Sequence, residues 1–144
     1  MKLEILSFEW NLFRSDTVEQ VTAMTKIWEV TILENHTPLV TVLNPSVVSI
    51  IYTDESWVKT EKDFAVWGWV LEVSNSNVKI LIDMLVTVDD VDIDKAEEAK
   101  KNALAMMEKY KNAKDKVDME KFIEAEDMLL KSVAKLKLHD TKIN

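Results

Sequence analysis

The chain has 144 residues, no cysteine and a formal net charge of −8 at pH 7. This length is enough for one domain with a hydrophobic core, with or without a small appendage. A chain without cysteine has no disulfide scaffold, thiol nucleophile or cysteine-ligated metal site. The negative charge argues against nucleic acid and against an anionic membrane surface as partners, because both are bound through clustered cations.

The sequence contains no apolar run close to the roughly 18 residues that a membrane helix needs, so we expect no direct membrane insertion. Its first ten residues, MKLEILSFEW, include an acid within the apolar run and lack a small-residue cleavage site. They predict a first strand rather than a signal peptide.

The composition changes near residues 87–94 and divides the chain into two segments. Nine of the eleven aromatic residues lie in 1–86, where the net charge is −6. Residues 87–144 are rich in Ala, Glu, Lys, Met and Leu, and their net charge is −2 with both signs interspersed. Such a mixture is typical of solvated helix faces. We therefore expect two domains, residues 1–86 built from strands and residues 87–144 built from helices.

Short runs that alternate between apolar and polar residues fill the first segment, which is the pattern of strands with one buried face. We predict about ten strands: Lys2–Phe8, Leu12–Phe13, Thr17–Met24, Trp28–Leu33, Leu39–Leu43, Val47–Tyr52, Ser56–Lys59, Phe64–Trp69, Val70–Ser74 and Asn77–Val86. Polar turns are expected at 54–55, 61–63 and 74–77. This pattern predicts a β-sandwich or flattened barrel. The side chains expected to point inward are Leu3, Ile5, Val18, Val21, Val30, Ile32, Leu39, Val48, Ile50, Val70, Val78, Ile80 and Ile82.

Apolar residues recur every three or four positions in the second segment, which predicts two helices. Asp92 or Asp94 is expected to cap the first helix and Asp118 the second. The apolar stripes are Ala96, Ala99, Ala103, Met106 or Met107, and Tyr110 in the first helix, and Met119, Phe122, Leu129, Val133 and Leu136 in the second. A connector as short as 112–115 makes the pair an antiparallel two-helix hairpin. A hairpin with one apolar stripe per helix is marginal alone, and it is able to dock, detach or extend.

The most distinctive stretch of the sequence is WEVTILENHTPLVTVLNPSVVSI, from Trp28 to Ile50. It resembles the pattern G-E-h-x-h-L-x-x-H-x-P-L-h-T-x-L-x-P-G-h-h-x-I, where h is apolar, of the epsilon subunits of bacterial F-type ATP synthases. The matching residues are Glu29, Leu33, His36, Pro38, Leu39, Thr41, Leu43, Pro45 and Ile50. The chain departs from the pattern at two glycine positions, where it has Trp28 and Ser46. Weaker similarity continues at 70–73, 91–101 and 136–138, so the resemblance extends over nearly the whole chain.

This resemblance implies a β-sandwich followed by a helical hairpin, in a subunit that is not itself an enzyme. Such a subunit would bind the gamma subunit and rest on the ring of membrane subunits, as a peripheral part of the ATP synthase at the cytoplasmic face of the inner membrane. The loop residues Glu34, Asn35, His36 and Thr37 would contact the ring, with His36 in an ordering role. The hairpin would inhibit ATP hydrolysis when it extends into the alpha/beta catalytic head.

Some bacterial members of this family bind ATP at the hairpin through an acid and arginines. By resemblance, Asp92 matches the acid, Lys95 replaces the first arginine, and Lys131 and Lys135 stand where arginines of the second helix would be. Lysine neutralises phosphate but does not form the bidentate contact of arginine, so ATP would bind weakly and no cofactor is required. Alternatively, these lysines are solvated and paired with glutamates on the helix surface. The alternative function is a stand-alone ATP-sensing module that uses the same hairpin.

The sequence shows no catalytic or metal-binding motif: it has no Gly-rich phosphate loop, nucleophile elbow or paired-histidine spacing. His36 and His139 lie in different predicted domains. The acidic stretch 89–94 lacks the ligand spacing and the glycine of an EF-hand loop, and it is typical of a solvated helix start. The sequence therefore predicts neither a catalytic residue nor a metal site.

Glycine and tryptophan are used unusually. The chain has one glycine and five tryptophans, whereas average usage predicts about ten glycines. Trp28 and Trp69 stand where the family pattern has glycine. Ordinary drift is one explanation; the other is that UGA codons meaning glycine in the source organism were read as tryptophan. The second hypothesis predicts exposed indoles and strain around Trp28 and Trp67–Trp69, and peptide mass spectrometry of the native protein would exclude it by finding tryptophan at those positions.

Overall fold

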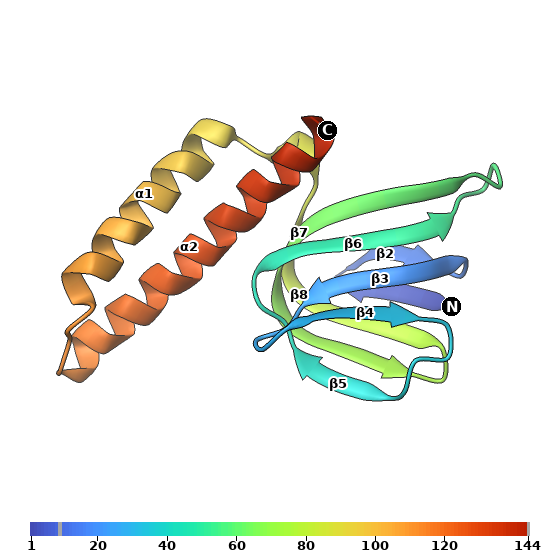
Figure 1. The fold of residues 1–144 in the computed structure, drawn as a ribbon, viewed down its shortest axis with the longest axis horizontal. Helices are drawn as coiled ribbons and strands as arrows, with labels where there is room; N and C mark the ends of the chain where they lie inside the picture. The colour runs from blue at the N-terminus through green and yellow to red at the C-terminus, as the bar shows by residue number, and fades with distance from the viewer. Residues whose placement is uncertain (9, 144) are drawn as a thin grey trace.

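The structure is a computed structural model that describes residues 1–8 and 10–143. Within those residues it contains eight strands, a 3₁₀ turn and two helices (Figure 1). The strands are β1 (Lys2–Leu6), β2 (Asn11–Ser15), β3 (Val18–Met24), β4 (Glu29–Leu33), β5 (Leu39–Val42), β6 (Ser46–Thr53), β7 (Lys59–Ser74) and β8 (Asn77–Val86). They are followed by η1 (Val88–Asp90), α1 (Ile93–Tyr110) and α2 (Lys116–Ile143). The predicted fold class is confirmed; Asn144, the end of the predicted helical segment, lies outside the described residues.

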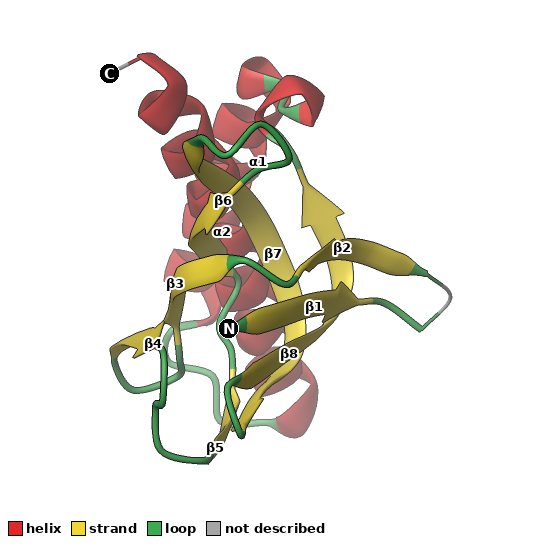
Figure 2. Ribbon diagram, turned by 90° about the vertical axis from the view of Figure 1, so that its right-hand side faces the viewer, coloured by secondary structure: helices red, strands yellow, loops and turns green. Residues whose placement is uncertain are grey.

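All eight strands belong to one sheet that curls around a single core. Their order is β2-β1-β8-β7-β6-β3-β4, and β5 pairs with β7. β1 and β8 run parallel, whereas the other pairs are antiparallel. Figure 2 shows β3 and β4 on one side of the sheet and β1, β2 and β8 on the other. Because buried side chains of β1 and β4 lie in one hydrophobic cluster, the two sides face each other as layers of a sandwich.

The core side chains follow the period-2 pattern closely. Of the thirteen residues expected to point inward, ten are buried in the main hydrophobic cluster, and Val30 and Leu39 are partly buried against it. Val70 is the exception, because it pairs with Leu81 and Val42 on the outer face of the sheet. Its neighbours Leu71 and Val73 are the buried residues of that stretch.

The long strand β7 joins the two layers. Residues 59–66 pair with β6, and residues 70–73 pair with β5. Between them the pairing with β8 shifts twice at Gly68, which leaves Trp69 and Asp83 as bulge residues. A Cβ atom added to Gly68 would lie 2.3 Å from the Cα atom of Ile82. The single glycine of the chain is thus required by the close approach of two backbones.

Two sequence expectations about β7 were wrong. Ser56–Lys59, Phe64–Trp69 and Val70–Ser74 were expected to be separate strands, but 59–74 forms one strand, so the described chain has eight strands rather than about ten. The expected turn at 61–63 is also wrong, because these residues pair with 49–51 of β6. Glu61 and Lys62 are exposed, so their polarity marks a solvated strand and not a turn.

The tryptophans fall into three environments. Trp28 and Trp69 are 63% and 52% exposed, as the codon hypothesis predicts, and Trp10 is exposed as well. Trp67 is only 8% exposed, which is contrary to that expectation. Backbone strain occurs at Trp57, whose φ is 61° and which is 88% exposed, and not at Trp28 or 67–69.

Trp57 occupies a turn position that favours glycine. The β6–β7 hairpin is closed by a hydrogen bond from the Asp54 N–H to the Val58 carbonyl (2.9 Å), with Trp57 in the left-handed region between them. The carboxylate of Asp54 accepts the N–H groups of Ser56 (2.8 Å) and Val58 (3.0 Å), and these bonds lower its pKa below the ordinary value. Hairpins with a three-residue loop usually place glycine at this left-handed position.

We expect Trp57→Gly to stabilise the protein. Relief of the left-handed strain contributes roughly 1–2 kcal/mol, and the greater flexibility of glycine in the unfolded chain offsets part of it, leaving a gain of about 0.5–1 kcal/mol. Urea unfolding followed by circular dichroism measures this change. Trp28→Gly is the control: it removes another exposed indole, from a position without positive φ, and it should not stabilise. An equal gain from both variants would contradict the explanation.

One of the two predicted helix caps is confirmed and the other is wrong. Asp92 caps α1, since its carboxylate accepts the Lys95 N–H at 3.1 Å. The cap predicted at Asp118 was wrong, because α2 begins two residues earlier. The carboxylate of Asp115 instead accepts the N–H groups of Val117 (2.8 Å) and Asp118 (3.2 Å). An acid at either position satisfies the first N–H groups of a helix, so the sequence alone does not distinguish them.

Candidate functional site

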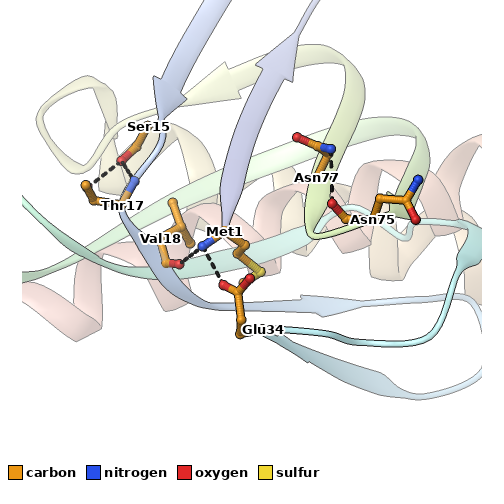
Figure 3. Close-up of polar contacts among 7 residues, drawn as sticks. All are labelled: Met1, Ser15, Thr17, Val18, Glu34, Asn75 and Asn77. Atoms are coloured by element: carbon orange, nitrogen blue, oxygen red, sulfur yellow. Dashed lines mark hydrogen bonds and ion pairs between the residues drawn. The ribbon is translucent and has the colours of Figure 1, made fainter.

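The predicted ring-contacting loop, Glu34–Thr37, lies between β4 and β5 at the end of the sandwich away from the helices (Figure 1). The amine of Met1 donates to the Glu34 carboxylate (2.7 Å) and to the Val18 carbonyl (2.8 Å), as Figure 3 shows. The hydrogen bond from this amine lowers the pKa of Glu34 below its ordinary value. The loop is therefore attached to the start of β1 and keeps its negative charge to a lower pH than an ordinary glutamate.

Hydrogen bonds within the loop fix its remaining residues. Asn35 has φ 61°, a left-handed conformation that asparagine tolerates. The His36 N–H donates to the Leu33 carbonyl (3.1 Å), and His36 Nδ1 lies 2.7 Å from the Thr37 carbonyl, to which it donates. Glu34, Asn35 and Thr37 are exposed. The loop presents polar groups in a fixed shape, with the imidazole bonded to its own backbone.

The helical hairpin docks on the sandwich through α2. A second hydrophobic cluster contains Ala65, Trp67 and Val86 of the sheet and Ala134 and Leu138 of α2. Figure 1 shows α1 on the side of α2 that faces away from the sheet. The hairpin is therefore attached by one helix and a small cluster, which fits an element that can leave the sandwich at limited cost.

The four residues predicted to bind ATP divide into two pairs with separate partners. Asp92 and Lys95 lie at the start of α1, where Lys95 Nζ is 3.8 Å from the Asp92 carboxylate. Lys131 and Lys135 lie on α2 with their Nζ atoms over the Trp67 ring, 5.9 and 5.2 Å from its centroid. Lys131 also pairs with Asp127 at 2.7 Å. Among the described residues, no ion pair or hydrogen bond joins the two pairs.

The outer face of the sheet carries a row of apolar side chains that sequence reasoning did not find. Val42, Val70, Leu81 and Leu6 pair directly across β5, β7, β8 and β1, so they point to the same face. We call these four residues the outer apolar row. Val42 and Leu81 are exposed, and Val70 and Leu6 are half-buried. A partly exposed apolar row across four strands is typical of an interaction surface.

An aromatic pair and a charged row border this surface. The Trp69 indole donates from Nε1 to Asp83 (2.7 Å), and its ring makes an edge contact with Phe8 at 6.1 Å. The next paired position across β7, β8 and β1 consists of Glu72, Lys79 and Glu4. Aromatic residues within a rim of mixed charges are typical of a protein interface.

No other kind of site stands out in the part of the chain that the structure describes. No group of three or more histidine, aspartate or glutamate side chains there is placed to hold a metal ion. No described helix combines the length and the apolar composition needed to cross a membrane.

A β-sandwich with a fixed polar loop at one end, an outer apolar row and a docked helical hairpin defines a protein-binding module. The chain belongs to the family described as "ATP synthase, Delta/Epsilon chain, beta-sandwich domain", whose profile matches residues 1–88. It is 40% identical over 103 residues to the ATP synthase epsilon chain of Hydrogenovibrio crunogenus, covering 72% of this chain and 67% of the relative. It is 32% identical to the epsilon chain of Bordetella petrii over 99% of this chain and 96% of the relative, which includes the hairpin.

A solved structure shows the same fold. The chain resembles a subunit in the structure of the central stalk and c-ring of the Tetrahymena thermophila mitochondrial ATP synthase, with a TM-score of 0.70 and 20% identity. This likeness covers 96% of each chain, so both the sandwich and the hairpin take part in it. The family resemblance stated from the sequence is confirmed.

Proposed function

We propose that this chain is a central-stalk rotor subunit of the F-type ATP synthase, which couples proton-driven rotation to ATP synthesis and inhibits ATP hydrolysis through its hairpin. Family membership supports the place in the complex. The observation that supports regulation is the attachment of the hairpin by α2 alone, through a cluster to which α2 contributes two buried side chains. An element held in this way can change between docked and extended states in response to a small change in their free-energy difference.

Three surfaces are assigned to three partners. The outer apolar row and Trp69 bind the gamma subunit, since an extended apolar face needs a permanent partner. The loop Glu34–Thr37 contacts the ring of membrane subunits, because its polar groups are held in one shape. The extended hairpin enters the alpha/beta catalytic head. The subunit itself is not an enzyme, and in bacteria it lies at the cytoplasmic face of the inner membrane as a peripheral part of the complex.

ATP binding by the hairpin remains a prediction. Asp92, Lys95, Lys131 and Lys135 would bind ATP weakly, because lysine lacks the planar fork of arginine and two of these lysines cover Trp67. Equilibrium dialysis of the isolated chain tests this prediction. Tight binding by the isolated chain would instead support the alternative of a stand-alone ATP sensor.

We expect the full chain to inhibit ATP hydrolysis by the catalytic head with gamma from the same organism. A version that ends at Val88 should bind gamma without inhibiting, because it retains the sandwich and lacks both helices. Titration of both forms against hydrolysis rate measures the difference, and circular dichroism checks that the shorter form folds. Equal inhibition by both forms would contradict the role of the hairpin. Absence of binding by the full chain would contradict the assignment of gamma as partner.

A further inference from the structure

Trp67 is the one buried tryptophan of the five, all of which lie in the described residues. It lies in the short stretch of β7 that precedes the bulge at Gly68, and its side chain points outward to α2 rather than into the core of the sandwich. It is the largest side chain in the cluster that joins the two domains, where its neighbours include Ala65 and Ala134. A large ring among small residues gives this contact a defined position.

Two lysines of α2 cover the ring. Lys135 Nζ is 5.2 Å and Lys131 Nζ 5.9 Å from the centroid, both within the distance at which a cation is attracted to an aromatic face. They are one helical turn apart, so they lie on the same face of α2. Leu138, on that face one turn further on, is fully buried in the same cluster. The ring thus receives two cations and apolar contacts from the same helix face.

The other contacts of the hairpin with the sandwich side are less specific. Lys142 pairs with Asp89 of η1 at 2.7 Å, but both side chains are exposed, and exposed ion pairs contribute little. Ala134 and Leu138 make apolar contacts, which do not prescribe one orientation. The cations over Trp67 depend on direction and distance, so they link one position on α2 to one position on β7.

The docked surface ends at this ring. Beyond it, an open cavity of about 710 Å³ separates α2 from the sheet, and Trp67, Lys131, Ile123 and Val42 are among its lining residues. The first half of α2 is therefore apart from the sandwich, and Trp67 marks the edge of the contact. A contact at the edge is the first to be lost when the helix lifts.

We propose that Trp67, Lys131 and Lys135 form a catch that holds the hairpin on the sandwich and sets the fraction of molecules in which it is docked. Its use in regulating hydrolysis rests on the proposed function, but the catch itself is a property of the isolated chain.

The full chain is suited to a distance measurement, because it has no cysteine of its own. Cysteines introduced at Lys26 and Glu126, two exposed positions that line the cavity from the β3–β4 connection and from α2, accept spin labels. Pulsed electron resonance then reports a short distance for the docked hairpin and a longer one for the released hairpin. The labelled parent chain should show mainly the short distance.

Two variants remove the catch from opposite sides. Trp67→Leu keeps an apolar side chain and removes the aromatic face, and Lys131→Met with Lys135→Met keeps the stems and removes the charges. Each should raise the ratio of released to docked molecules by about tenfold. The combination should release no more than Trp67→Leu alone, because without the aromatic face the lysine charges have no such interaction left to lose. Trp67→Tyr, which keeps an aromatic face, should remain largely docked.

The control is Lys116→Met with Lys137→Met, which removes two charges from exposed positions of α2. It should leave the distance distribution of the parent unchanged. The proposal would be overturned if the lysine variant and this control behaved alike, or if the effects of the tryptophan and lysine changes were additive. The lysine variant decides the question even if Trp67→Leu does not fold. Because ATP synthase is absent from the experiment, a failure of the proposed function does not affect its outcome.

Discussion

Gly68→Ala is expected to lower the free energy of unfolding by about 3 kcal/mol or more, which is a large part of the stability of a domain of this size. The added Cβ would lie 2.3 Å from the Ile82 Cα atom and 2.8 Å from the Asp83 nitrogen. Both are backbone atoms, so no side-chain rotation relieves the overlap. The bulge would have to open, and with it the pairing of β7 with β8 on both sides.

Urea unfolding followed by circular dichroism measures this effect, and Ser49→Ala on the neighbouring strand β6 is the control. Ser49 is half-buried and already has a Cβ atom, so its replacement removes only a hydroxyl group. We expect a change for Ser49→Ala below about 1 kcal/mol. A similarly small change for Gly68→Ala would show that β7 and β8 can separate at the bulge without cost to the fold.

The strands and their core were predictable from the sequence because their signal is local. Ile80 and Ile82 alternate with polar or exposed neighbours along one strand, and that alternation alone assigns them to the buried face. Val70 was misassigned because it is followed by another apolar residue, so the alternation has two possible phases. The pairing of Val70 with Leu81 across the bulge decides between them, and a bulge is not encoded in the periodicity.

The contacts between the sandwich and the hairpin could not be predicted from the sequence, for a different reason. The sequence predicts phosphate-binding or solvated lysines at Lys131 and Lys135, and the codon hypothesis predicts an exposed indole at Trp67. Each of these predictions considers a residue only in the context of its own segment of the sequence. The contact among them depends on the sheet face that α2 covers and on the rotation of the helix about its axis. Periodicity identifies an apolar stripe but does not name the surface that receives it.

The same limit applies to the outer apolar row. Val42, Val70 and Leu81 come from three strands, and no short stretch of sequence contains more than two of them. Only the register of the sheet places them side by side. Once the row is assembled, an exposed apolar surface at this position favours a protein partner, and gamma is the partner proposed above.

We therefore expect Leu81→Glu to abolish tight binding of the gamma subunit while the sandwich stays folded. Leu81 is 47% exposed, so the isolated chain tolerates a charge there, whereas an interface would have to bury that charge without a partner. The expected loss is about 2 kcal/mol or more, a rise in Kd of roughly 30-fold. Calorimetric titration of gamma with the two chains measures Kd, and circular dichroism reports on the fold.

Val58→Glu provides the comparison. Val58 is 55% exposed in the β6–β7 turn, far along the sheet from the outer apolar row, so the new charge should leave gamma binding unchanged. If both variants bound gamma equally well, the apolar row would not be the interface. If Val58→Glu alone weakened binding, gamma would bind at the β6–β7 turn instead. Loss of binding in Leu81→Glu alone would place gamma on the same sheet face as α2, so that gamma and the docked hairpin occupy neighbouring parts of one surface.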